Sequence, residues 1–234
     1  THFKNATGLP DEDHYTTAKD LSLLARALIR DYPAHYKIYK EKYFSYNDIR
    51  QANRNSLLWR DDAIDGMKTG HTDAAGFCLV ASAEKAGMRL VSVVMGATSE
   101  RARSTESQKL INYGFRYFES VKLYDGFESL RRVKVWGGLH ESLDVGIEAP
   151  AQLTIPSGAR AALSAEVTLD PVIKAPVSQG QTLGLLRISL EGETLLERPV
   201  VALNAVDEAG FVSSLIDEAS LFFLSLFSGD PLAL

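Results

Sequence analysis

Cysteine is almost absent from this chain of 234 residues, which contains only Cys78. One cysteine cannot close an intramolecular disulfide, so a small disulfide-stapled scaffold is excluded. Cys78 lies in an apolar run, where we expect it to be a small core residue. The histidines have no metal-ligand spacing, and no second cysteine is present to complete a zinc site. The sequence therefore predicts no metal and no cofactor.

Positive charge is also scarce, since the formal net charge is -5. The short cluster Arg131-Arg132-Val133-Lys134 alternates as the edge of a strand does, and no basic stripe accompanies it. Nucleic acid is therefore excluded as a partner. With 45% hydrophobic and 24% charged residues, the chain is an ordinary globular one, able to bury one large or two modest cores.

The most informative segment present is Lys68-Thr69-Gly70, which combines a cation, a hydroxyl group and a residue without a side chain. Apolar runs at 77–81 and 90–95, joined by Lys85-Ala86-Gly87, predict a hairpin that follows it, so the triplet is expected near the start of a strand. In an edge strand, Gly70 would let a ligand backbone approach, Thr69 would donate a hydrogen bond and Lys68 would add positive charge. That combination suits a carboxylate, although a solvated strand end with a turn glycine is the alternative for the triplet alone.

The alternation of a strand separates these side chains. Lys68 and Gly70 should lie on one face, and Thr69 and His71 on the other. Lys68 and Thr69 can therefore serve one pocket only if this strand borders the cleft.

Three stretches around the triplet, residues 53–59, 65–73 and 75–83, occur in order and close together, and together they resemble a known family. The chain is similar to D-alanyl-D-alanine carboxypeptidases, the low-molecular-mass penicillin-binding proteins of the 5/6 group. The similarity continues through residues 39–42, 88–90, 114–119 and 153–156, so it covers nearly the whole chain.

The resemblance implies a serine-type peptidase that removes the terminal D-alanine from peptidoglycan pentapeptides through an acyl-enzyme, and that binds β-lactam antibiotics. It implies catalytic roles for Lys68, Thr69 and Gly70, and substrate binding by Thr69, Arg54 and His71. Arg54 would be a second carboxylate partner or a structural brace. His71 would face the substrate groove or hold a structural hydrogen bond.

One departure from the family is large, because its Ser-x-x-Lys and Ser-x-Asn motifs, expected well upstream of Lys68, are missing. Thr1 has no methionine or signal region before it, so we expect a fragment that is inactive alone. Ser82-Ala83-Glu84-Lys85 and Ser45-Tyr46-Asn47 match the two motifs literally. We interpret both as chance matches, because Ser82 lies in an expected strand, where positions three apart face opposite sides, and Ser45 lies too close to Lys68.

Helical spacing predicts two helices in residues 1–118. The first starts after the candidate caps Thr16 and Thr17 and stops at Asp31-Tyr32-Pro33, with an apolar stripe of Leu21, Leu24, Leu28 and Ile29. The second starts near Ser99, covers the sheet, and has a stripe of Leu110, Ile111, Phe115 and Phe118.

From about Val121 the pattern changes to short alternating strands separated by glycine, proline and serine. Runs at 183–190 and 194–198, joined by Glu191-Gly192-Glu193, predict the clearest hairpin. We expect residues 119–206 to be a β-rich pedestal or protein-contact module.

The tail, residues 207–234, carries apolar residues at helical spacing from Phe211 to Phe227, opposite Asp217 and Glu218. It is too short and too polar for a good membrane span, so we expect an amphipathic helix lying in the membrane interface. No lysine or arginine follows Arg198, so its insertion must rest on apolar burial. Packing on the β-rich domain or on another subunit is the alternative.

Together these interpretations predict an α/β fold, a partial penicillin-binding transpeptidase-like domain, followed by a small all-β domain and a C-terminal amphipathic helix. The expected location is the periplasmic face of the bacterial inner membrane, with peptidoglycan pentapeptide, β-lactams and the membrane surface as partners. A noncatalytic envelope-binding or scaffolding fragment, or a relative of class A β-lactamases, remains the alternative.

Overall fold

The computed structural model describes residues 1–210, which belong to two compact units, one comprising Thr1–Glu119 and the other beginning at Ser120. The amphipathic helix expected in the tail lies outside the described residues. The division into segments 1–118, 119–206 and 207–234 therefore stays a prediction. Among residues 1–210, no helix is both long enough and apolar enough to cross a lipid bilayer.

The first unit is built on an antiparallel three-stranded sheet in the order β3-β4-β5. The turn between β4 and β5 has Ala86 and Gly87 at positive φ, the backbone that a two-residue hairpin turn requires. The hairpin predicted around Lys85-Ala86-Gly87 is confirmed. The strands are β3 (Ile64–Thr72), β4 (Gly76–Lys85) and β5 (Met88–Ala97).

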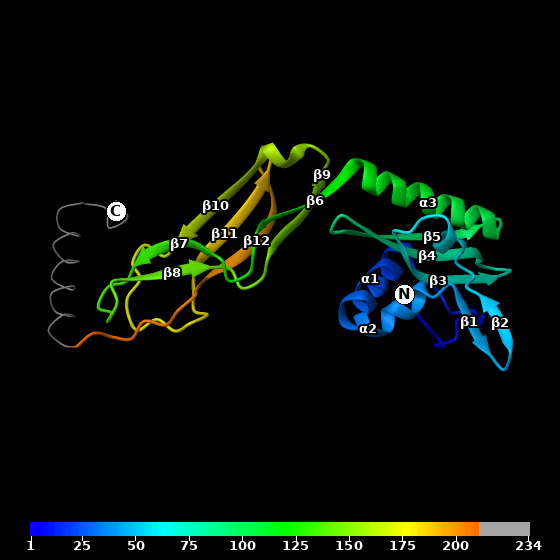
Figure 1. The fold of residues 1–234 in the computed structure, drawn as a ribbon, viewed down its shortest axis with the longest axis horizontal. Helices are drawn as coiled ribbons and strands as arrows, with labels where there is room; N and C mark the ends of the chain where they lie inside the picture. The colour runs from blue at the N-terminus through cyan, green and yellow to red at the C-terminus, as the bar shows by residue number, and fades with distance from the viewer. Residues whose placement is uncertain (211–234) are drawn as a thin grey trace. The chain divides into compact units, whose positions relative to one another are not determined.

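Helices cover both faces of this sheet, α1 (Ala18–Asp31) on one and α3 (Glu100–Tyr117) on the other (Figure 1). The Thr17 hydroxyl accepts from the Asp20 amide and the Ser99 hydroxyl accepts from the Ala102 amide, so each helix begins at a side-chain cap. Both helices match the predictions. Short helices complete the unit: α2 (Pro33–Tyr36), η1 (Lys37–Lys40) and η2 (Ser56–Trp59).

Two members of the predicted apolar stripes do not face the core. Leu24 is 56% exposed and Leu110 is 50% exposed, so both predictions were wrong at these positions. Helix α1 buries Ala25, and α3 presents Arg103, Ser104 and Ser107 to the interior beside Ile111. Small and polar residues occupy these places because the helices pack close to the sheet.

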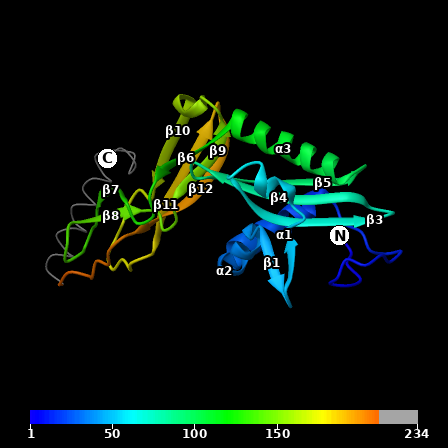
Figure 2. The same ribbon diagram turned by 45° about the vertical axis from the view of Figure 1, so that its right-hand side comes forward.

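A hairpin of β1 (Tyr43–Tyr46) and β2 (Ile49–Ala52) extends away from the three-stranded sheet (Figures 1 and 2). Asn47 and Asp48 both have positive φ, which again builds a two-residue turn. The sequence analysis predicted neither of these strands.

The second unit is a β-rich domain, as its alternating pattern predicted. A five-stranded sheet has the order β10-β11-β12-β8-β7, and β6 pairs with β9. The hairpin of β11 and β12 turns at Glu191 and Gly192, both at positive φ, as predicted. The elements are β6 (Phe118–Tyr124), β7 (Ser129–Lys134), β8 (Ser142–Gly146), β9 (Ala151–Pro156), η3 (Ala159–Ala162), β10 (Leu163–Leu169), β11 (Thr182–Leu190) and β12 (Glu193–Ala202).

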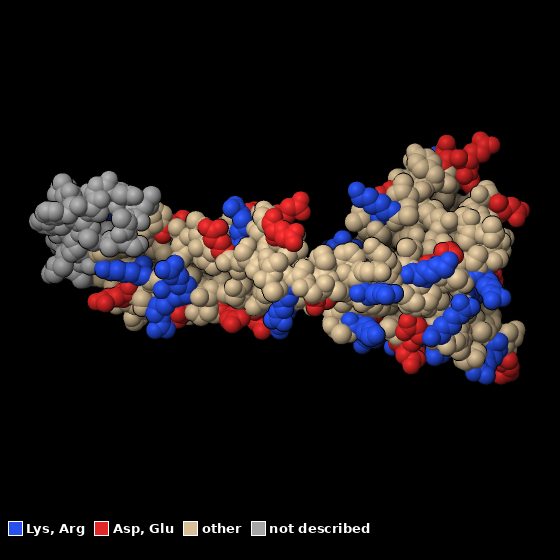
Figure 3. Space-filling view, turned by 90° about the horizontal axis from the view of Figure 1, so that it is seen from above, with Lys and Arg blue, Asp and Glu red and all other residues tan. Residues whose placement is uncertain are grey.

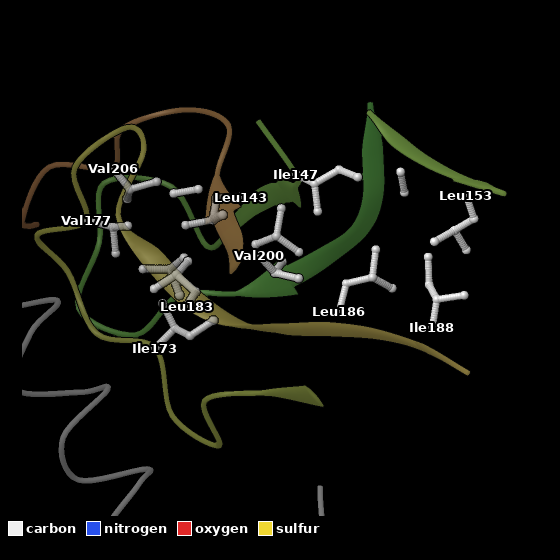
Figure 4. Close-up of a cluster of buried hydrophobic side chains, with 14 of the residues drawn as sticks. Leu143, Ile147, Leu153, Ile173, Val177, Leu183, Leu186, Ile188, Val200 and Val206 are labelled. Atoms are coloured by element: carbon white, nitrogen blue, oxygen red, sulfur yellow. The ribbon is translucent and has the colours of Figure 1, made fainter. Parts of the chain in front are cut away.

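The second unit has one core of buried aliphatic side chains. Leu186, Ile188 and Val200 are fully buried within it, and Figure 4 shows their side chains among those of neighbouring strands and loops. Such burial contributes roughly 1.5–3 kcal/mol for each large aliphatic side chain. The unit therefore has a hydrophobic core of its own.

A polar network beneath the sheet holds the beginning of β3. Tyr36, 5% exposed, hydrogen-bonds with the Ser82 hydroxyl at 2.5 Å, and Ser82 donates to Asp65. Arg89 closes the network by donating to Asp65 at 2.7 Å. A Cβ atom at Gly66 would overlap the Tyr36 hydroxyl, so glycine is required there.

The environment of Tyr36 changes the pKa of its hydroxyl group. Burial, reinforced by the negative charge of Asp65, raises this pKa from its ordinary 10.0 to about 12, although the hydrogen bond with Ser82 and the charge of Arg89 act in the opposite direction.

This pKa predicts how stability depends on alkaline pH. The folded protein keeps the Tyr36 proton between pH 10 and 12 while the unfolded chain loses it, so this stabilisation is complete below pH 10 and is lost as pH rises toward 12. We expect Tyr36→Phe to lose less stability than the wild type over that interval, as measured by urea unfolding at a series of pH values. Tyr32→Phe, which alters an exposed tyrosine, is the control and should follow the wild type. Equal losses in all three proteins would contradict the prediction.

Candidate functional site

Strand β3 lies at one end of the three-stranded sheet, with β4 on one side and no strand of residues 1–210 paired to its other side. Lys68, Thr69 and Gly70 stand opposite Val80, Leu79 and Cys78 of β4. Beside Gly70, a Cβ atom would meet nothing closer than Cys78 Cβ at 3.9 Å. The triplet therefore has an open edge where an extended ligand backbone has room to approach.

The two faces of β3 have different neighbours. Lys68 pairs with Val80, which packs against the core of α1 and α2, whereas Thr69 pairs with Leu79, which belongs to the core beneath α3. Thr69 is 9% exposed, and the exposed Lys68 folds back so that its Nζ donates to the Thr69 carbonyl at 2.6 Å. The Lys68 ammonium therefore bonds to the backbone of the triplet, while the side chains of Lys68 and Thr69 start on opposite faces of the sheet.

A buried arginine that the sequence analysis missed lies against the end of this triplet. Arg103 of α3 is 2% exposed, and its Nη1 donates to the Gly70 carbonyl at 3.2 Å. Its Nη2 donates to Glu100 at 3.2 Å, and within residues 1–210 its buried Nε has no hydrogen-bond partner. A charged residue at a sheet-facing position of α3, eight residues before Ile111, was the available sequence signal.

One aromatic ring, that of Phe77, lies beside this guanidinium. The exposed His71 stacks on Phe77 with ring centroids 3.9 Å apart, and Arg103 lies 5.7 Å from the centre of the Phe77 ring. The α3 side of β3 therefore carries Thr69, His71 and Arg103. A hydroxyl, an imidazole and a guanidinium together suit an anionic group.

Arg54 is placed by the two asparagines that flank it. Asn53 donates to the Glu41 carbonyl at 3.0 Å, and Asn55, 1% exposed, donates to the Gly66 carbonyl at 2.9 Å. Arg54 itself is exposed, with no hydrogen bond or ion pair to any other described residue. Its guanidinium is therefore available to a ligand, and the contacts that a structural brace requires are missing from the described part of the chain.

The two literal motif matches occupy other settings. Ser82 lies in β4 as expected, is completely buried, and bonds to Tyr36 and Asp65. Ser45 lies on the exposed strand β1. Cys78 is free and partly exposed, so its prediction as a core residue was wrong.

Both units of the chain are similar to known protein families. Residues 1–99 match the D-alanyl-D-alanine carboxypeptidase family, and residues 118–208 match the C-terminal domain of penicillin-binding protein 5. In Escherichia coli K12, D-alanyl-D-alanine carboxypeptidase DacA is 42% identical over 225 residues, which are 95% of this chain and 56% of the relative. The carboxypeptidase DacC of the same organism is 41% identical over 97% of this chain and 57% of its own length.

A solved structure of penicillin-binding protein 5 from Haemophilus influenzae is similar in fold, with a TM-score of 0.79 and 39% identity. The match covers 89% of this chain and 61% of that protein. The chain thus spans a little over half the length of the curated relatives it matches. On sequence and fold together, it belongs to the family of D-alanyl-D-alanine carboxypeptidases that carry the C-terminal domain of penicillin-binding protein 5.

Proposed function

We propose that this chain supplies the Lys68-Thr69-Gly70 side of the active site of a serine-type D-alanyl-D-alanine carboxypeptidase, which trims peptidoglycan pentapeptides and is acylated by penicillins. The observation that carries the proposal is the open edge of β3, which presents this triplet beside the buried Arg103. The nucleophilic serine and its lysine would come from a Ser-x-x-Lys segment in a longer polypeptide.

The surface of the first unit supports this role. Leu23 and Leu24 of α1 are exposed, as are Ile38 and Met95, whereas the large apolar residues exposed in the described part of the second unit are Phe127, Leu139 and Leu195. Unpaired apolar surface on this scale is usual where further protein packs. The first unit therefore has the surface expected of part of a larger domain.

Substrate binding would use the free edge of β3. The extended end of the pentapeptide would lie alongside the strand, and its terminal carboxylate would accept hydrogen bonds from Thr69 and from the guanidinium of Arg54. His71, stacked on Phe77, would border the same end of the groove. Arg103 would hold the Gly70 carbonyl and add positive potential without leaving the interior.

The reaction would be acyl transfer to water. The serine oxygen attacks the carbonyl carbon of the bond between the two terminal D-alanines and its proton passes to the base. The base then gives that proton to the amide nitrogen, so that the C–N bond breaks and the last D-alanine leaves as a free amine. Water then hydrolyses the ester and regenerates the serine. Lys68 would keep the pocket positive, which favours the ionised carboxylate and the negative charge that develops on the attacked carbonyl oxygen.

Without the upstream serine, the chain as given should form no acyl-enzyme. We expect no mass increase when it is incubated with benzylpenicillin and measured by intact-mass spectrometry, and we expect an adduct in a longer polypeptide that carries the Ser-x-x-Lys segment. An adduct on the shorter chain, at Ser82 or Ser45, would overturn our interpretation of these serines. A longer polypeptide that stays unlabelled would instead favour a noncatalytic envelope-binding protein.

In that longer polypeptide, Thr69→Val and Lys68→Ala should lower the rate of D-alanine release much more than they lower stability. Losing one preorganised donor or charge reduces turnover by roughly 10²–10³, whereas Lys68 is exposed and contributes little to folding. Lys85→Ala, an exposed lysine at the end of β4, is the matched control and should keep normal turnover. Near-normal hydrolysis by folded Thr69→Val and Lys68→Ala would reject the assignment.

We also propose that the apolar residues of the tail, from Phe211 to Phe227, attach the protein to the outer leaflet of the bacterial inner membrane. The tail carries acids and no basic residue, so binding would rest on apolar burial and depend weakly on salt. Co-sedimentation with liposomes should be strong for the full chain and weak for a chain ending at Gly210. Equal partitioning of both forms, or binding abolished by moderate salt, would contradict the proposal.

A further inference from the structure

The hairpin of β1 and β2 has one face that contacts its own unit and one that is bare. Cross-strand partners share a face, and Tyr43 pairs with Ala52 while Ser45 pairs with Arg50. On that side the Arg50 guanidinium lies 3.8 Å from the centre of the Tyr43 ring, and Tyr43 meets the edge of Trp59 at 5.8 Å. These contacts attach the hairpin to η2.

The opposite side, which we call the hairpin face, consists of Phe44, Tyr46, Ile49 and Gln51. Phe44 is 65% exposed, Tyr46 67% and Ile49 61%. Within residues 1–210, none of the four side chains forms a hydrogen bond, ion pair or ring contact. Two aromatic rings and an isoleucine directed at solvent from a two-stranded hairpin are unusual without a partner, because they add apolar surface and no stability.

The chemistry of this face matches a sugar chain. It carries no charge, which disfavours an anionic lipid or a charged peptide as its occupant. Its rings offer flat apolar surface for the C–H side of a pyranose, while the Tyr46 hydroxyl and the Gln51 amide can bond to sugar hydroxyl and acetamido groups. On the face of the molecule that Figure 3 shows, acidic and basic side chains are interspersed.

The position of the hairpin connects it to the peptide site. Strand β2 leads through Asn53 directly into Arg54, and Asn55 bonds to Gly66 at the start of β3. A four-residue strand is about 13 Å long, and a five-residue peptide spans at most about 17 Å. A stem peptide whose end is held at Arg54 and β3 therefore has the length to leave its sugar near this hairpin.

We propose that the hairpin face binds the glycan strand of peptidoglycan, so that the enzyme holds the sugar chain while the site at β3 takes the attached peptide. This inference rests on the proposed function for its choice of ligand. It adds a second binding site, on residues outside the peptide pocket.

The test uses chains of β-1,4-linked N-acetylglucosamine, labelled at one end, and measures their anisotropy with the full chain. These sugar chains share the sugar backbone of the glycan strand and are uncharged, whereas peptide-free N-acetylmuramic acid would expose a lactyl carboxylate. We expect binding by the wild type and at least about tenfold weaker binding by Phe44→Ser/Tyr46→Ser, because aromatic anchors dominate such contacts. Leu24→Ser removes a comparably exposed apolar residue from α1 and should bind as the wild type does. Thermal melting checks that every variant is folded.

The proposal would be overturned by no binding by the wild type, by equal binding by the double variant, or by binding that disappears in the longer polypeptide carrying the Ser-x-x-Lys segment. Self-association of the wild type that the double variant lacks would assign the face to a second copy and would also overturn it. The sugar chains contain no D-alanine, so their binding is independent of penicillin acylation. Glycan binding without acylation would reject the proposed function and leave this site in place.

Discussion

The ladder between β3 and β4 is the constraint on which the candidate site depends. It leaves one edge of β3 open, and its register puts Lys68 opposite Val80 and Thr69 opposite Leu79, on different sides of the sheet. A slip of one residue would exchange these faces, removing Thr69 from the α3 side where His71 and Arg103 lie. The two apolar cores that receive Val80 and Leu79 therefore set the chemistry of the edge as well as the fold.

Polar contacts then fix β3 on both sides of the triplet. Near the start of the strand, Asp65 belongs to a network with Tyr36, Ser82 and Arg89, in which the buried phenol stays protonated and the carboxylate is paired. At its end, Arg103 holds the Gly70 carbonyl. Buried polar groups of this kind stabilise one arrangement only while they are satisfied, so each anchor favours a single position of β3 over nearby alternatives.

Local chemistry explains what the sequence predicted well. Helix caps and hairpin turns depend on contacts within a few residues, so they can be predicted from the sequence without knowledge of the fold. Examples are the caps Thr17 and Ser99 and the turns at Ala86-Gly87 and Glu191-Gly192. The exposure of Leu24 and the burial of Arg103 depend instead on how closely each helix packs on the sheet. The β1–β2 hairpin was missed because its strands bury nothing, and burial is what gives a strand its recognisable alternation. Lys68 and Thr69 were proposed as site residues from resemblance and pattern, whereas the contact of Arg103 with the Gly70 carbonyl could be seen only in the structure.

An open strand edge is ordinarily a liability, since it invites pairing with any extended chain. Natural edges are protected by charges, especially lysine, and Lys68 is an exposed lysine in the middle of this one. Its ammonium group bonds to the neighbouring Thr69 carbonyl, and the space beside Gly70 stays open. A neutral or basic strand gains nothing from that charge, whereas a peptide ending in a free carboxylate does. The same residue thus opposes nonspecific pairing and favours the kind of chain that the proposed reaction requires.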